Sequence, residues 1–176
     1  KNGTLAIMVG GDKDTYDKCT SILSHIGKKI FYVGDKVGQG QAMKVINNLL
    51  SSAALALTSE ALVLGVKAGL DPNIMVDVLN VSSGRNSATE DKVKSSILSR
   101  KFDYGFKTGL AYKDMKFYLD LAEKLKVPTL VGGPIINFWN YVLSQGGEKE
   151  DNTAVIKYIE QWAGVEVKNK DNSYTH

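Results

Sequence analysis

The sequence predicts a mainly α-helical chain: a multi-helix domain around a long central helix, preceded by a short strand–helix–strand edge of a sheet. Three observations lead to this prediction. Two short runs rich in β-branched and aromatic residues lie before Gly34. A helical pattern of apolar residues follows from Gly40 onward. From Val45 to Ser59 no charged residue interrupts an apolar segment, and a helix that is apolar nearly all round belongs in the centre of a bundle.

The N-terminal part reads as two strands joined by a helix. The runs Thr4–Val9 and Lys29–Val33 each end in a glycine-containing turn, which is typical of strands. Between them, Asp12–His25 has apolar residues at helical spacing, with Asp12 or Asp14 as the N-cap. Two short strands alone would be poorly stable, so we expect them to be the edge of a larger sheet formed by residues upstream.

The central helix is predicted to begin at Gly40 and to end just before Gly69, which would serve as its C-cap. Asp71 then begins a short helix over Pro72–Leu79, because proline is favoured in the first helical turn. The polar residues 82–87 follow as a loop. The later predicted helices are Ala88–Leu98, Leu110–Leu125, Gly133–Val142 and Thr153–Ala163.

Two details of these later helices are also predicted. Glu90 and Lys94 stand four residues apart on Ala88–Leu98 and are expected to form an ion pair. Asp151 or Asn152 is expected to cap the last helix. The aromatic run Phe102–Phe106 reads as a connector.

Composition restricts the classes of partner. The net charge of +3 and the pI of about 8.8 are only mildly basic, and no dense Lys/Arg run occurs, so no nucleic-acid surface is expected. With His25 and His176 as the only histidines, a zinc cluster is not expected, and no metal site is predicted. Cys19 is the single cysteine, which excludes an internal disulfide and fits a reducing compartment; we interpret it as a small buried apolar residue.

The long apolar segment does not read as a membrane span. A span needs roughly 20 predominantly apolar residues, and Glu60 ends this segment. The first residues show no secretory signal, because the apolar run Leu5–Val9 is too short. We therefore expect a cytoplasmic protein. The polar residues inside the segment are Asn47, Asn48, Ser51, Ser52, Thr58 and Ser59.

Lys44 is the first candidate for chemistry. In a helix, Lys44 and Asn48 lie one turn apart on the same face, with Asn47 beside them. A lysine on a largely buried helix is costly unless it is paired or used, and a buried lysine can transfer protons near neutral pH. The alternative is a lysine whose stem packs while its amine reaches water. Likewise, the two asparagines could simply be satisfied by neighbouring backbone.

Four segments in order resemble the C-terminal two-thirds of the β-hydroxyacid dehydrogenase family, which includes 3-hydroxyisobutyrate dehydrogenase and tartronate semialdehyde reductase. They cover the chain up to about Val167. The segments are Gly3–Asp12, Gly38–Asn48, Ser59–Pro72 and Phe102–Asp114.

This resemblance implies roles for individual residues. It implies that Lys44 is the catalytic acid/base, that Asn48 and, as a weaker candidate, Asn47 contact the substrate, and that Lys113 contacts the nicotinamide cofactor, with Phe106 as a further cofactor contact. It implies an enzyme that interconverts a small 3-hydroxy acid and its aldehyde or ketone with NAD or NADP. On the residues alone, Lys113 and Asp114 could be an ordinary solvated pair.

The chain departs from the family at its start. No Gly-x-Gly-x-x-Gly occurs in the sequence, so the phosphate-binding loop is not in this chain. The resemblance implies three parts: residues 1–36 as the remnant of a truncated Rossmann domain, 37–167 as an all-helical substrate and dimerisation domain, and 168–176 as a flexible tail. We therefore interpret the chain as a fragment of a longer enzyme that is inactive by itself.

Other interpretations stay open. Arg85, in the polar loop 82–87, could bind a carboxylate or phosphate or could be an ordinary loop residue. The chain could be a non-catalytic helical oligomerisation module of the same fold, although Lys44 is retained. A 6-phosphogluconate-type enzyme would be expected to have histidine in place of Asn47. Apolar helix surface also favours a homo-oligomer, a dimer or tetramer, in either case.

Overall fold

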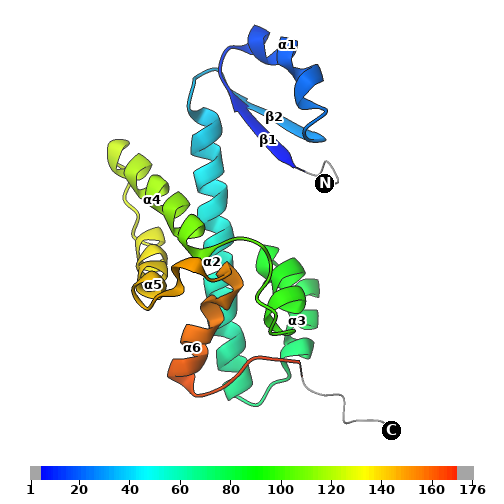
Figure 1. Cartoon of the computed structure of the whole chain (residues 1–176), viewed down its shortest axis with the longest axis vertical. Helices are drawn as coiled ribbons and strands as arrows, with labels where there is room; N and C mark the ends of the chain where they lie inside the picture. Colours follow the sequence, from blue (N-terminus) through cyan, green and yellow to red (C-terminus); the bar gives the residue numbers. More distant parts are fainter. Residues whose placement is uncertain (1–4, 170–176) are drawn as a thin grey trace. The chain divides into compact units, whose positions relative to one another are not determined.

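The computed structural model describes residues 5–169 of the chain. Its backbone contacts divide the chain into an N-terminal unit, Lys1–Asn48, and a helical unit, Leu49–His176 (Figure 1). Helix α2 (Gln39–Lys67) gives its first turns to the N-terminal unit and the rest to the helical unit.

The N-terminal unit contains the predicted strand–helix–strand. Strands β1 (Ala6–Gly10) and β2 (Lys29–Gly34) pair in parallel, with Ile7 opposite Ile30. Parallel neighbours need a crossover connection, which helix α1 (Lys13–Leu23) supplies. Asp12 caps this helix, as expected, because its carboxylate accepts a hydrogen bond of 2.8 Å from the backbone N–H of Thr15.

The surface of helix α1 corrects one expectation. Cys19 is exposed, and none of the residues of α1 is buried in this chain. The predicted burial of this cysteine is therefore wrong here. Its apolar neighbours suggested a covered helix, but Ile22, one turn further on, is also 66% exposed. Tyr16 of this helix contacts the sheet through Tyr32, with 5.0 Å between the ring centroids.

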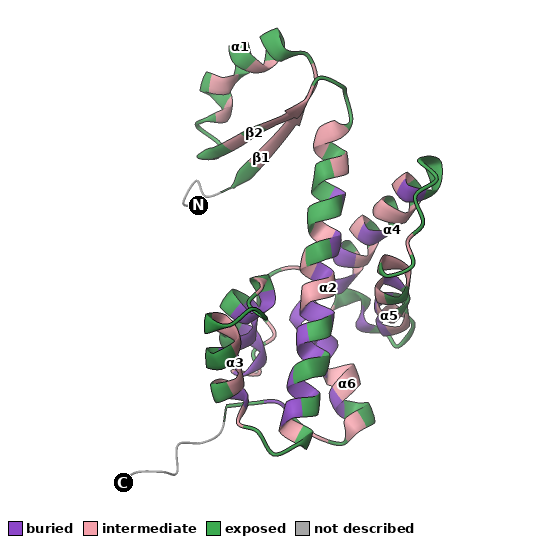
Figure 2. Cartoon of the chain, turned by 180° about the vertical axis from the view of Figure 1, so that it is seen from behind, coloured by how far each residue is buried: buried purple, intermediate pink, exposed green. Residues whose placement is uncertain are grey.

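The helical unit is built around α2. Leu55 and Leu62, two turns apart on this helix, are fully buried in the core, and Figure 2 shows the buried face along this part of the helix. Among the described residues α2 is the helix long and apolar enough to cross a membrane, with a hydropathy of 1.7, but half of that stretch is buried inside the protein. A core position accounts for this composition without a membrane.

The other helices cover α2. Helices α4 (Thr108–Lys124) and α5 (Gly132–Ser144) pack together on one side, and α3 (Pro72–Val81) lies on the other (Figures 1 and 2). Trp139 of α5 is completely buried and is the largest side chain of the core. The remaining elements are the π-helix η1 (Ala88–Ile97), the 3₁₀ turns η2 (Gly147–Lys149) and η3 (Asn152–Val155), and α6 (Ile156–Ala163).

This architecture confirms the predicted mainly α-helical fold. The predicted caps Asp71 and Asp151 both accept a backbone N–H at the start of their helices. Gly69 adopts φ of +91° just after α2, which suits a glycine C-cap.

The expected ion pair of Glu90 with Lys94 is wrong. Glu90 pairs with Arg85, and Lys94 pairs with Asp77 of α3. The reason is the winding of η1, which is a π-helix rather than an α-helix. Its hydrogen bonds join residues five apart, so side chains four apart no longer stand directly above one another.

The end of the described chain is tied to the helical unit. The Arg100 guanidinium pairs with the buried Glu160 at 2.6 Å and donates to the carbonyl of Val167 at 3.2 Å. Asn169 donates its backbone N–H to the carbonyl of Leu98 at 3.0 Å. The predicted flexible tail, 168–176, lies outside the described residues from position 170 onward.

Candidate active site

The first turns of α2 pack very closely on strand β1. A Cβ atom added to Gly40 would lie 2.6 Å from the carbonyl oxygen of Met8. One added to Gly10 would lie 2.8 Å from the backbone nitrogen of Gly40. Only glycine at both positions permits this approach, which brings the next turn of α2, where Lys44 stands, beside the strand.

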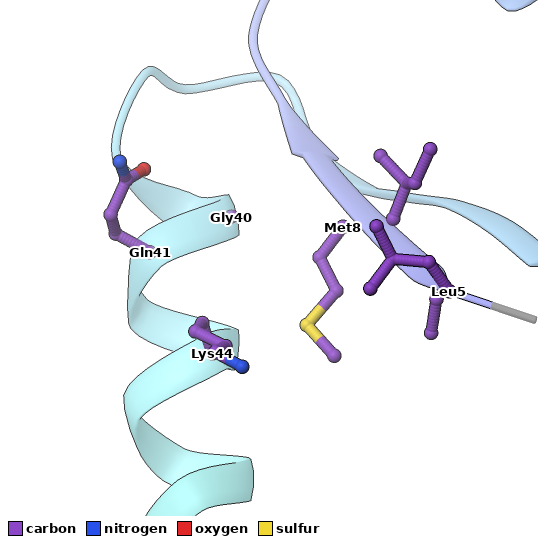
Figure 3. Close-up of a pocket in the computed structure, with 7 residues that line it drawn as sticks. Leu5, Met8, Gly40, Gln41 and Lys44 are labelled. Carbon is purple, nitrogen blue, oxygen red and sulfur yellow. The ribbon is translucent and has the colours of Figure 1, made fainter. Parts of the chain in front are cut away.

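A cleft of about 340 Å³ separates this turn from the strand, and Lys44 lines it (Figure 3). In the close-up the Lys44 amine projects from the helix on the side of β1, where Met8 extends its thioether. The cleft is mostly apolar, and Lys44 supplies its charged group. The lining residues are Leu5, Ala6, Ile7, Met8, Gly40, Gln41 and Lys44.

Lys44 is nevertheless an exposed residue in this chain. The expectation that it is held away from solvent is therefore wrong for the chain as described. The apolar run continues around this part of α2, but Met43 and Ile46 are 38% and 39% exposed. The apolar sequence predicted burial, whereas few residues of the N-terminal unit cover these turns.

The two asparagines follow Lys44 on α2. Because this segment is a regular α-helix, Asn48 lies one turn beyond Lys44 on the same face. The Asn47 carboxamide donates to the Asn48 carboxamide oxygen at 3.4 Å, and Asn48 is the more buried of the two. This end of the helix thus presents an amine and a carboxamide in line.

Arg85 lies in the helical unit and borders a polar cleft of about 410 Å³ after α3, together with Asn80 and Ser82. Its side chain is 64% exposed, and its Nε lies 3.5 Å from a Glu90 carboxylate oxygen. An exposed pair of this kind is weak, so the guanidinium stays accessible at the edge of the polar cleft.

The predicted cofactor contacts, Lys113 and Phe106, also belong to the helical unit. Lys113 projects from α4 with a 57% exposed side chain, 3.7 Å from the Asp114 carboxylate and over the ring of Phe117. Phe106 packs partly against the hydrophobic core, and its backbone N–H donates to Asp151 at 3.3 Å. Phe106 therefore has a structural role that its sequence position did not reveal.

Lys92 is the charged residue that the sequence did not single out. It is only 4% exposed, and its ammonium donates to the hydroxyl of Ser51 on α2 at 2.8 Å. The ring of Tyr104 lies 5.5 Å from it. Burial lowers the pKa of Lys92 from its usual value of 10.5, although Asp91 and Asp151 oppose this shift. In the sequence Lys92 stands among other charged residues of the predicted helix Ala88–Leu98, and this pattern gave no sign of burial.

The carboxylates near Lys92 are engaged elsewhere. Asp91 accepts a hydrogen bond of 2.8 Å from the Tyr104 hydroxyl, and burial together with this bond raises the pKa of Tyr104 to about 12. Asp151 accepts from the backbone N–H groups of Gly105 and Thr153 at 2.7 and 3.0 Å. Burial raises the pKa of Asp151, but these hydrogen bonds outweigh it and lower the pKa overall.

The chain's own residues fit only part of a nicotinamide dinucleotide site. The carboxyl end of β1, at Gly10, is the end of a parallel strand at which ligands bind in sheets of this kind. The glycine-rich loop for the diphosphate does not occur in the sequence. Residues 5–169 show no cluster of three or more metal-ligating side chains.

Two family models match the chain. The model described as NAD-binding of NADP-dependent 3-hydroxyisobutyrate dehydrogenase matches residues 38–159. The model described as the NAD binding domain of 6-phosphogluconate dehydrogenase matches residues 1–34. The two matches follow one another along the chain and together extend over most of both structural units.

Known proteins agree with these matches. The 2-(hydroxymethyl)glutarate dehydrogenase of Eubacterium barkeri is 41% identical over 94% of this chain and 54% of its own length. The mitochondrial 3-hydroxyisobutyrate dehydrogenase of Mus musculus is 34% identical over 92% of this chain and 50% of its own. The structure of Mycobacterium tuberculosis 3-hydroxyisobutyrate dehydrogenase with L-serine is similar, with a TM-score of 0.80 at 29% identity; the match covers 89% of this chain and 55% of that one.

The chain spans about half the length of the curated relatives it matches. Within that half, the match extends from the paired strands to the last helices. The predicted resemblance is confirmed: the chain belongs to the β-hydroxyacid dehydrogenase family, a family of oxidoreductases that use NAD or NADP.

Proposed function

We propose that this chain is the catalytic and helical part of an NAD(P)-dependent dehydrogenase that interconverts a small 3-hydroxy acid and its aldehyde or ketone. The observation that carries the proposal is the placement of Lys44 in the cleft beside β1, with Asn48 one turn away on the same helix face. The relatives that act on 3-hydroxyisobutyrate and 2-(hydroxymethyl)glutarate support the substrate class.

The chemistry assigned to Lys44 is general acid–base catalysis. When bound, the nicotinamide cofactor accepts the hydride from the hydroxyl-bearing carbon in oxidation or returns it in reduction. In oxidation the neutral Lys44 amine takes the hydroxyl proton as the C–H bond breaks. In reduction the Lys44 ammonium donates that proton to the carbonyl oxygen. Proton transfer by a positioned group contributes about 10²–10⁴-fold to the rate.

The roles of the other residues combine what the resemblance implies with the contacts that each residue makes. The Asn48 carboxamide would orient the substrate by hydrogen bonding, with Asn47 supporting the position of that carboxamide. The exposed Lys113 would contact the cofactor, and Phe106 would fix the connector that leads into α4. Arg85 would bind a substrate anion in competition with the exposed Glu90 carboxylate.

The whole protein would need more than this chain. The parallel pair β1 and β2 would be the edge of a larger cofactor-binding sheet, since two strands alone are marginal. We propose residues 1–36 as the end of that Rossmann domain and 37–167 as the substrate domain, in a cytoplasmic enzyme. The choice between NAD and NADP would rest on the residues that bind the ribose.

The direct test is Lys44→Met in the whole protein, assayed by the change in nicotinamide absorbance with 3-hydroxyisobutyrate and 2-(hydroxymethyl)glutarate. The proposal expects kcat to fall by about 10²-fold or more. Lys18→Met is the matched control, because Lys18 is an exposed lysine of the same unit. Retention of more than about a tenth of kcat by the Lys44 variant would contradict the proposal.

We also propose that the enzyme is a homo-oligomer, a dimer or tetramer. Three leucines of α2, spaced seven residues apart, are exposed in the helical unit: Leu50, Leu57 and Leu64, at 65%, 58% and 70%. Such a stripe is the usual seam of packed helices. In sedimentation velocity at micromolar concentration, Leu57→Glu would shift the oligomer toward monomer, and a wild-type protein that is already monomeric would contradict the assignment.

The alternative function is a non-catalytic oligomerisation module. If Lys44→Met leaves kcat unchanged while the oligomer persists, this alternative becomes the better interpretation.

A further inference from the structure

The Lys92 ammonium is a buried charge of the helical unit for which the fold supplies no ion-pair partner among the described residues. Taking a charged amine out of water is costly, and buried lysines normally have a carboxylate partner. Within residues 5–169 no ion pair joins Lys92 to a carboxylate. Its direct contacts are one hydroxyl, that of Ser51, and the face of the Tyr104 ring.

The nearby acids do not supply the missing charge. The Asp91 carboxylate is held by the Tyr104 hydroxyl, and the Asp151 carboxylate by backbone N–H groups of the 105–106 connector. The raised pKa of Tyr104, about 12, keeps that phenol neutral at physiological pH, so it is not a counter-ion either. An ammonium has three donors, and the one hydrogen bond of Lys92 leaves capacity for an incoming acceptor.

The hydroxyl group of Ser51 also has hydrogen-bonding capacity left. Its oxygen accepts from Lys92, but its own hydroxyl proton has no acceptor among the described residues. Ser59, two turns further along α2, behaves differently: its hydroxyl donates to the carbonyl of Leu55 at 2.8 Å and is thereby satisfied. The Ser51 proton is therefore available to the same ligand that the ammonium would bind.

We infer that Lys92 and Ser51 form a carboxylate-binding pair in the helical unit, which takes the anionic end of a small organic acid. One cationic N–H and one O–H, 2.8 Å apart at their heavy atoms, match the two oxygens of a single carboxylate. A single positive charge suits a monoanionic group better than a phosphate dianion. Tyr104, 40% exposed, is the member of the cluster that faces solvent and would rotate to admit the ligand. The identity of the acid as a hydroxy acid rests on the proposed function, but the binding itself does not.

The test is an NMR titration of the ¹⁵N-labelled 176-residue chain with sodium glutarate at constant ionic strength. Glutarate carries the carboxylates but has no hydroxyl to oxidise, so binding is measured without turnover or cofactor. The inference expects saturable shifts at the amides of Ser51, Lys92 and Tyr104. Lys92→Met should raise the dissociation constant about tenfold or more. The neutral isostere glutaramide should produce no saturable shifts.

Two variants make the result specific. Lys94→Met is the matched control, since Lys94 is an exposed lysine of the same helix and pairs with Asp77. It should leave the dissociation constant within about twofold. Ser51→Ala places a good helix former in α2 and tests the second donor independently of Lys92. It should weaken binding severalfold, because one of the two donors is lost.

Several outcomes would overturn the inference. The first two are shifts that do not saturate, and a glutarate affinity that is the same in the wild type, Lys92→Met and Ser51→Ala. A third is a loss of glutarate affinity in Lys94→Met as large as that in Lys92→Met. The last two are binding of glutaramide as strong as that of glutarate, and binding of inorganic phosphate tighter than that of glutarate. None of these outcomes depends on Lys44, so this inference and the proposed dehydrogenase activity can fail independently.

Discussion

The N-terminal unit and the helical unit each contain one lysine that lines a candidate site, and the two lysines differ in their exposure to solvent. Lys44, on the first turns of α2, is exposed and borders an open cleft beside β1. Lys92, in the π-helix of the helical unit, is 4% exposed and contacts a serine hydroxyl and a tyrosine ring. An exposed lysine beside a cleft is accessible to whatever enters that cleft. A buried lysine instead holds its charge where desolvation is costly, and Lys92 has no carboxylate ion-pair partner among the described residues to offset that cost.

This difference teaches that burial is decided by neighbours and not by the apolar character of one helix. The same helix α2 contributes Ile46, 39% exposed, to the N-terminal unit and fully buried Leu55 to the helical unit. The helical unit surrounds its part of α2 with α3, α4 and α5, whereas the N-terminal unit provides a two-stranded sheet.

The largest expected effect comes from removing the centre of the helical unit. Trp139→Ala deletes a fully buried indole and should lower the free energy of unfolding by about 3–5 kcal/mol. Urea denaturation followed by circular dichroism measures this change. Trp162→Ala is the control, because Trp162 is 59% exposed and should cost less. Equal losses in the two variants would contradict the assigned core.

A second change tests the N-terminal unit separately. Gly40→Ala would push a methyl group to 2.6 Å from the Met8 carbonyl oxygen, which should cost about 1–3 kcal/mol through overpacking. Gly133→Ala is the control, since the nearest atom to its added Cβ would be 4.0 Å away. Hydrogen exchange should become faster in β1 for the Gly40 variant while the core of the helical unit stays protected. Unchanged exchange in β1 would show that the close contact between Gly40 and Met8 does not stabilise the N-terminal unit.

A third change examines the connector next to Lys92. Asp151→Asn replaces an acceptor of several N–H groups with an amide and should destabilise the chain by about 1–3 kcal/mol. The pKa of Asp151 is lowered in the folded state, so its stabilisation is present above the unfolded value near 3.8 and is lost as pH falls through the folded pKa. Denaturation midpoints at pH 7 and pH 3 measure this dependence. The variant should show a smaller loss on acidification, and an equal loss would contradict the role of the carboxylate.

The smallest expected effect sharpens the lysine comparison itself. Lys92→Met removes a buried charge that has no ion-pair partner and should raise the free energy of unfolding at pH 7 by about 1 kcal/mol. Because the folded pKa of Lys92 is lowered from 10.5, the unfolded state binds more protons, and wild-type stability should rise as pH increases toward 10.5. This rise should be weaker in the variant. Urea titrations at pH 7 and pH 9.5 would contradict the interpretation if both proteins responded alike.

Local rules in the sequence predicted most of the fold. The caps Asp12, Asp71 and Asp151 were predictable because a side-chain acceptor before an apolar run marks a helix start. The π-helical winding of η1 was not, since apolar spacing does not distinguish it from an α-helix. The ion pairs of Glu90 and Lys94 therefore differed from those expected.

The candidate site was predictable only in part. Lys44 and Asn48 stand close together because four residues make about one helical turn, and the sequence alone fixes that relation. The exposure of Lys44 and the burial of Lys92 depend on contacts between segments far apart in the chain, such as Ser51 with Lys92. Sequence periodicity contains no information about such contacts.

The central claim is that Lys44 transfers the proton, and the pH dependence of kcat tests it most directly. We predict that the whole protein shows a limb in its kcat–pH profile caused by ionisation of the acid/base, and that Lys44→Met both lowers kcat and abolishes this limb. A Lys44→Met enzyme that keeps the wild-type limb, whatever its rate, would show that another group carries the proton and would contradict the account.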